Sequence, residues 1–128
     1  MRQERWPSNR PDRELDIYTP ERKANDMFPI RLSIVSYHIW TWSRWPERKD
    51  ALRRFAEVFC PDILCLQELQ VESQAVLDSA LSNHNRVHDK FEGWTCEGNI
   101  YWNGKLFEKL DHGFEDVGIL VTDRRLFW

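Results

Sequence analysis

A short run of apolar residues, 63–66, passes directly into the polar pair Gln67-Glu68. The run is too short for a helix and is rich in branched side chains, so it predicts a buried strand. In sheets flanked by helices, ligands and metal ions collect at the carboxyl ends of strands. A carboxylate at that place suits a hard cation such as Mg²⁺. Glu68 is therefore a candidate metal ligand, although the same spacing also fits the plain start of a loop.

Two further elements precede this strand and constrain the type of fold. Residues 30–37 alternate in polarity and are rich in β-branched side chains, which predicts a central strand. Residues 46–59 predict a helix, because they begin with a proline and carry apolar residues at helical spacing. The helix residues expected to face inward are Ala51, Leu52, Phe55, Val58 and Phe59. A strand–helix–strand unit brings both strand ends, and with them His38 and Glu68, to one edge of the sheet.

Three segments together resemble one known family. Residues 61–68, Pro-Asp-Ile-Leu-Cys-Leu-Gln-Glu, resemble the proline–aspartate–hydrophobic–glutamine–glutamate motif of the endonuclease/exonuclease/phosphatase superfamily, the DNase I-like metal-dependent phosphoesterases. Residues 31–37 resemble the family's first core strand, and residues 97–102 resemble its glycine-led strand. The resemblance implies an α/β fold in which residues 30–128 form the N-terminal half of a two-sheet β-sandwich flanked by helices, and hence an incomplete domain.

The resemblance also implies roles for two residues. Glu68 takes the place of the glutamate that binds the catalytic Mg²⁺ or Mn²⁺. His38 stands where the family has a catalytic asparagine, which offers a donor and an acceptor at any pH, whereas a neutral histidine must adopt one tautomer. His38 could be a metal ligand or proton carrier, could replace the amide at lower activity, or could mark a decayed site. These three alternatives stay open.

The family places its leaving-group acid and its base in a region beyond Trp128. Asp111-His112 is not taken for the family's terminal Asp-His pair, because it follows a predicted hairpin, and a polar turn is expected there. The leading interpretation is a Mg²⁺-dependent phosphodiester or phosphomonoester hydrolase domain, truncated and with its activity in question as it stands. Whether the chain is an enzyme would then depend on the C-terminal half. The alternative is a non-catalytic pseudoenzyme or protein-interaction module.

Composition narrows the partners and the location. The resemblance implies a phosphate ester of unknown class as the partner. Nucleic acid stays an alternative, but the net charge of −3 gives no overall reason to expect it or a membrane surface. No apolar run reaches the roughly 18 residues of a membrane span, and the N-terminus has no hydrophobic signal core. We therefore expect an intracellular protein, in the cytoplasm or nucleus. The three cysteines are expected to be thiols.

The remaining segments give local expectations. Residues 1–29 are polar and contain four prolines, which predicts a flexible leader. Residues 38–45 form a loop with three tryptophans that could stack on a substrate ring, although we expect at least two of them to pack. Residues 71–81 predict a second helix. His84 and His88 could grip a metal if they were helical, but a surface loop is expected. Asn103-Gly104 predicts a type I′ hairpin between residues 99–102 and 105–110.

Overall fold

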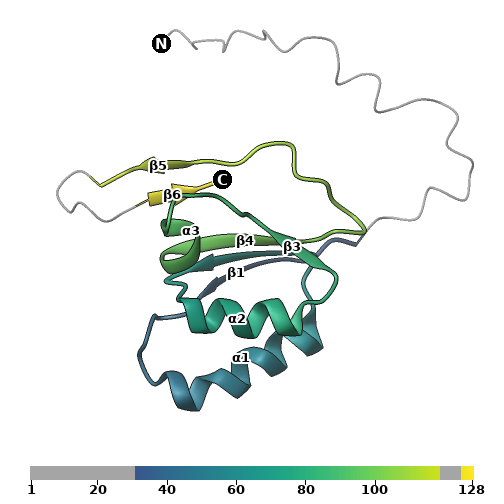
Figure 1. Ribbon diagram of the computed structural model, residues 1–128. Helices are drawn as coiled ribbons and strands as arrows, with labels where there is room; N and C mark the ends of the chain where they lie inside the picture. Colours follow the sequence, from purple (N-terminus) through teal and green to yellow (C-terminus); the bar gives the residue numbers. More distant parts are fainter. Residues whose placement is uncertain (1–30, 119–124) are drawn as a thin grey trace, which may run out of the picture. The chain divides into compact units, whose positions relative to one another are not determined.

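The computed structural model of the chain describes residues 31–118 and 125–128. Residues Leu32–Trp128 form one compact unit. The expected leader, residues 1–29, lies outside the described residues. The elements of the described part are β1 (Ile34–His38), α1 (Trp45–Phe59), β2 (Ile63–Gln67), α2 (Val71–Ala80), β3 (His84–Arg86), α3 (Gly93–Cys96), β4 (Gly98–Asn103), β5 (Phe114–Asp116) and β6 (Arg125–Phe127) (Figure 1).

Four of the strands form a mixed sheet in the order β1-β2-β4-β3. Strands β1 and β2 are parallel, with α1 as the connection between them. Strand β4 is antiparallel to β2 on one side and to β3 on the other. The predicted strand–helix–strand unit is therefore confirmed, and both parallel strands end at the same edge of the sheet.

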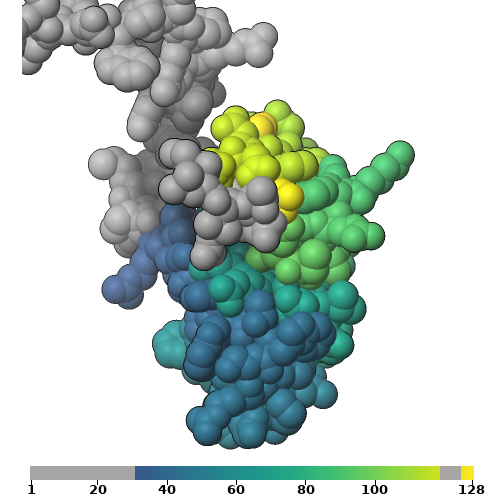
Figure 2. Space-filling view, turned by 90° about the vertical axis from the view of Figure 1, so that its left-hand side faces the viewer, coloured from purple at the N-terminus to yellow at the C-terminus, as the bar shows by residue number. Residues whose placement is uncertain are grey.

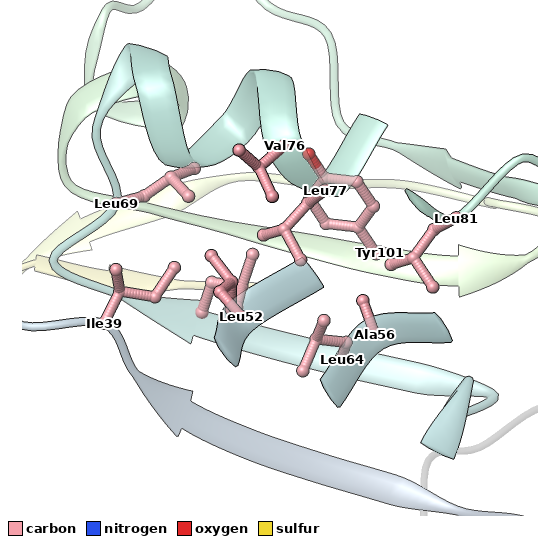
Figure 3. Close-up of a cluster of buried hydrophobic side chains, with 10 residues drawn as sticks. Ile39, Leu52, Ala56, Leu64, Leu69, Val76, Leu77, Leu81 and Tyr101 are labelled. Carbon is pink, nitrogen blue, oxygen red and sulfur yellow. The ribbon is translucent and has the colours of Figure 1, made fainter. Parts of the chain in front are cut away.

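Helices α1 and α2 cover one face of this sheet (Figure 1). Side chains two residues apart point to the same face of a strand, so Leu64 and Leu66 of β2 both reach the helices. Leu64, Leu77 and Ala56 are fully buried, and burial of each leucine contributes about 1.5–3 kcal/mol. The buried cluster consists of Ile39, Leu52, Ala56, Leu64, Leu66, Leu69, Val76, Leu77, Leu81 and Tyr101 (Figure 3).

A second sheet, β5 with β6, lies against the other face of β4. Phe127 of β6 packs edge-on against the buried Trp94, with ring centroids 4.7 Å apart. Phe127 also lies over Gly98, where an added Cβ would be 2.7 Å from the carbonyl oxygen of Leu66. Only glycine at this position allows β4 to approach β2 this closely. The expected α/β fold with two sheets and helices on the outside is confirmed.

The predicted hairpin after β4 is wrong. Residues 107–110 form no strand, and Gly104 does not have the positive φ that a type I′ turn requires. Instead, the backbone N–H groups of Leu106 and Phe107 both donate to the carbonyl oxygen of Asn103, 3.0 Å away. The physical reason is that β2 and β3 already occupy both sides of β4, so a hairpin partner would have no free edge to pair with.

The prediction for the inward face of α1 is partly wrong. Leu52 and Ala56 are buried, as the helical spacing indicates for Leu52. Val58 and Phe59, however, are 70% and 69% exposed. The helix contacts α2 and the sheet along the line through Leu52 and Ala56, four residues apart. Val58 lies off this line, whereas Phe59 lies on it and packs on Phe55 at the end of the helix, with ring centroids 5.2 Å apart.

Two other expectations concern the cysteines and membrane spans. Cys60, Cys65 and Cys96 are free thiols, as predicted. The longest helix of residues 31–118, α1, has 15 residues, and no helix of the described part is long and apolar enough to cross a membrane.

The starts of β1 and β2 are joined by a reciprocal pair of polar residues, which gives a first prediction. The Asp62 carboxylate accepts hydrogen bonds from the backbone N–H of Ser33, 2.8 Å, and from its hydroxyl, 3.0 Å. These bonds lower the pKa of Asp62. A lowered pKa stabilises the fold above the unfolded-state pKa, and this contribution is lost as the pH falls through the folded-state value. We expect Ser33→Ala to raise the pKa of Asp62 part of the way back, because only the hydroxyl bond is removed.

Carboxyl NMR titration of Asp62 measures this change. Ser79→Ala serves as the control, because Ser79 lies in α2 and contacts Arg53 rather than Asp62. An unchanged Asp62 titration in Ser33→Ala would show that the hydroxyl bond does not contribute to the lowered pKa.

Candidate active site at the ends of β1 and β2

The two residues singled out from the sequence meet at the edge of the sheet where β1 and β2 end. His38 is the last residue of β1, and its partner in the parallel register is Gln67, the residue before Glu68. Nε2 of His38 lies 2.9 Å from Oε1 of Glu68. The side chains are 58% and 35% exposed, so both are open to a ligand. The predicted convergence of His38 and Glu68 is confirmed, while their chemical roles stay predictions.

Glu68 sits on a strained turn that is held on both sides. Its φ is 53°, which is uncommon for a residue other than glycine. Its carbonyl oxygen accepts a hydrogen bond from the N–H of Thr41, 3.2 Å away. The next residue, Leu69, is fully buried, and its N–H donates to the carbonyl oxygen of Glu97 at 3.1 Å. Backbone strain of this kind persists where surrounding contacts determine it, often at functional sites.

Gln67 lies next to the His38–Glu68 pair and connects the two strands that carry it. Its side-chain nitrogen donates to the hydroxyl of Ser36 on β1, 3.0 Å away, and to the carbonyl oxygen of Cys65, 3.2 Å away. The amide therefore bridges the two parallel strands on the face opposite the helices. This bridge holds the end of β1, and with it His38, in register with the end of β2.

A hollow of about 290 Å³ lies beside Glu68. Its polar lining comes from four separate parts of the chain: Thr41, Gln67, Glu68, Cys96, Glu97 and Arg125. Glu97 and Arg125 form an ion pair across it. Figure 2 shows the molecule from the side on which β1 and β2 end, where blue, teal, green and yellow surface meet. Sequence reasoning missed Glu97 and Arg125, because a separation of 28 positions along the chain leaves no local signal of the pairing.

The loop after β1 differs from the expectation that most of its tryptophans pack. Trp45 packs against the core, but Trp40 and Trp42 are each 56% exposed. Trp40 and Thr41 both have positive φ, 67° and 43°. The predicted packing of at least two of the three tryptophans is therefore wrong.

The other histidines expected from the sequence lie away from this site. Nε2 of His84 is 2.7 Å from the carbonyl oxygen of Pro61, whereas Nδ1 of His88 lies 3.3 Å from the Arg86 guanidinium. The two rings have separate partners, so the metal alternative for them is not supported. His112 lies in a segment without strand or turn structure and pairs with Asp89 at 3.0 Å, so the polar turn expected there is not formed.

The donor chemistry of the site fits a metal that takes few protein ligands. Within residues 31–118 and 125–128, no group of three or more His, Cys, Asp or Glu side chains is arranged to hold a metal ion. Mg²⁺ is commonly bound by one or two carboxylates together with substrate phosphate and water, which a single accessible carboxylate such as Glu68 satisfies. Burial, and then the carboxylates of Glu97 and Glu92, raise the pKa of the Cys96 thiol. Cys96 therefore stays protonated and is a poor ligand.

Comparison with known proteins reveals likeness at the level of the fold. No protein-family model matches the chain, and no curated protein matches it in sequence. A crystal structure of D. rerio TDP2, humanized by 14 mutations, matches with a TM-score of 0.53 and 18% identity over 65% of this chain. A crystal structure of an endonuclease/exonuclease/phosphatase from Bacteroides vulgatus matches with a TM-score of 0.50 and 19% identity over 62% of it. The chain spans 34% of the length of each of these structures.

Proposed function

We propose that this chain, which carries part of the endonuclease/exonuclease/phosphatase fold, contributes the metal-binding side of a Mg²⁺- or Mn²⁺-dependent phosphoester hydrolase site. The observation that carries the proposal is the delivery of His38 and Glu68, 2.9 Å apart, by the ends of two parallel strands. Ligand sites form at strand ends of this kind. The fold supports phosphoester chemistry in general, whereas the metal and the two residue roles are the proposed part.

Glu68 is the proposed metal ligand. Its carboxylate is fixed by the strained turn after β2 and is still accessible to solvent. A divalent metal bound there would polarise a phosphate oxygen and stabilise charge that develops in the reaction. Most of its remaining coordination would come from water and the substrate phosphate. The hollow beside Glu68 offers space for that phosphate.

His38 is the proposed orienting residue for the phosphate or the attacking water. A neutral imidazole that donates from Nε2 to Glu68 leaves Nδ1 as an acceptor. Because both side chains are well exposed, their pairing contributes at most about 1 kcal/mol. A metal ion therefore competes with His38 for Glu68 at little energetic cost.

A non-catalytic binding module is the second candidate. It is favoured by the His38–Glu68 contact, which occupies the carboxylate that a metal would use. It is also favoured by the lack of a third nearby donor among the described residues. Such a module would bind a phosphate ester or a protein without turnover.

Calorimetry with Mg²⁺ and Mn²⁺ tests the proposal. We expect one weak site on the wild-type chain and a loss of at least about tenfold in affinity in Glu68→Gln, since the amide removes the charge that a hard cation requires. Glu57→Gln is the matched control, because Glu57 is an exposed carboxylate on α1 whose partner among the described residues is its neighbour Arg53, 4.0 Å away. If the wild type and Glu68→Gln give equal heats of Mg²⁺ and Mn²⁺ binding, Glu68 is not the metal ligand and this part of the proposal is wrong.

A further inference from the structure

Two exposed tryptophans lie in the loop that follows β1. Trp40 and Trp42 are each 56% exposed, whereas Trp94 is only 2% exposed. They lie on either side of Thr41, which lines the same hollow as Glu68. Single exposed apolar side chains need no explanation, but two large exposed aromatic residues in one short loop are typical of binding surfaces.

The loop that carries them is held by one side chain, Arg48 of α1. Its Nε donates to the carbonyl oxygen of Ser43 at 2.7 Å, and its Nη1 donates to that of Ile39. Its Nη2 lies 3.3 Å from the carbonyl oxygens of Trp40 and Thr41. The guanidinium thus binds four carbonyl groups of residues 39–43 at once. The fixed fork of an arginine suits this task, whereas a lysine ammonium offers only a point charge.

The held loop has an unusual backbone that is tied to the proposed metal ligand. Of the five non-glycine residues with positive φ in the described chain, Trp40, Thr41 and Arg44 lie in this loop and Glu68 lies beside it. A β-branched residue such as Thr41 rarely adopts positive φ. The N–H of Thr41 donates to the carbonyl oxygen of Glu68, and the N–H of Ile39 donates to that of Gln67. The loop is therefore tied to the end of β2 by two backbone hydrogen bonds.

We propose that Trp40 and Trp42 bind a planar aromatic ring of the substrate, such as a nucleobase attached to the phosphate ester, and that Arg48 is the positioning residue of this subsite. The inference rests on the proposed function, because it takes the phosphate to be at Glu68. It narrows the substrate class from any phosphate ester to one that carries a ring close to its phosphate.

Stacking on aromatic side chains suits this geometry. Base-on-indole stacking works for every base, because each has a π-face, and it needs no sequence-specific hydrogen bonds. The guanidinium of Arg48 lies 5.8 Å from the centroid of the Trp40 ring, which stabilises the indole while more than half of the residue stays open. A rigid loop also lowers the entropy lost when a ring binds.

Two probes that differ only by the ring test the proposal. AMP and ribose 5-phosphate share the phosphate and the sugar, and binding of each is followed by NMR titration in Mg²⁺. We expect AMP to bind the wild-type chain about tenfold more tightly than ribose 5-phosphate, and Trp40→Ala or Trp42→Ala to remove most of that difference. Phe59→Ala is the control, because Phe59 is 69% exposed at the far end of α1 and should leave both affinities unchanged.

Arg48→Lys tests the positioning role. We expect the preference for AMP over ribose 5-phosphate to fall severalfold, with the affinity for ribose 5-phosphate little changed. A purely structural role would lower the melting temperature and leave the preference intact.

The outcomes separate this inference from the proposed function. Equal affinities for the two probes, or binding of neither, overturn the ring subsite, and the effect of Glu68→Gln on metal binding still decides the hydrolase proposal on its own. A preference for AMP that survives both tryptophan substitutions also overturns it. A preference for AMP that disappears in both tryptophan variants supports the ring subsite. If the same chain binds no metal at Glu68, the proposed hydrolase function is wrong.

Discussion

Asn99→Asp should destabilise the folded chain by about 3–5 kcal/mol at neutral pH. Asn99 is 1% exposed, and its side-chain nitrogen donates to two carbonyl oxygens, that of Val87 at 3.1 Å and that of Trp94 at 2.7 Å. Its side-chain oxygen accepts from the N–H of Val87 at 3.1 Å. An aspartate would place a buried negative charge against both carbonyl oxygens and would lose both donors. Urea unfolding followed by circular dichroism measures the change.

The loss of stability caused by Asn99→Asp should be smaller in acid, because a protonated carboxyl group can again donate one of the two hydrogen bonds. Asn83→Asp is the matched control, since Asn83 is exposed and the same substitution there should cost less than about 0.5 kcal/mol. A deficit in Asn99→Asp no larger than that of the control would mean that the connection from β3 to β4 relaxes to admit water. The fold would then not depend on this amide.

The sequence predicted the elements whose signals are local. The apolar run of β2, the helical spacing of α1 and the strand β1 are each carried by consecutive side chains. Their order determines that β1 and β2 are parallel and that His38 and Glu68 converge. The acidic candidate could therefore be found from Gln67-Glu68 at the end of a buried strand, before any geometry was known.

The parts that escaped prediction depend on contacts between distant segments. Strand β3 has only three residues, yet it takes the free edge of β4 and so removes the expected hairpin. Strand β5 is exposed along its whole length and has no apolar alternation to reveal it. The exposure of Trp40 and Trp42 follows from the hydrogen bonds that Arg48 donates to the backbone of their loop. The spacing of residues along the chain does not predict these bonds.

If the proposed function holds, any magnesium-dependent hydrolysis of bis(4-nitrophenyl) phosphate by this chain, measured as kcat/KM, should fall on the order of 10³-fold in Glu68→Gln. A metal stabilises the charge that develops on the phosphate by several kcal/mol, and each 1.36 kcal/mol corresponds to about tenfold in rate. The amide keeps the shape of Glu68 but not its charge. Release of 4-nitrophenolate measures the rate, and Glu57→Gln should match the wild type.

His38→Asn should act in the opposite direction and raise the rate up to about fivefold at subsaturating Mg²⁺. The substitution removes the contact with Glu68 that competes with the metal and introduces an amide that can donate and accept at any pH. A fall in rate would instead indicate that the imidazole itself takes part, as a metal ligand or a proton carrier. If neither the wild type nor His38→Asn hydrolyses the ester, while both bind Mg²⁺ through Glu68, the binding module is the better description of this chain.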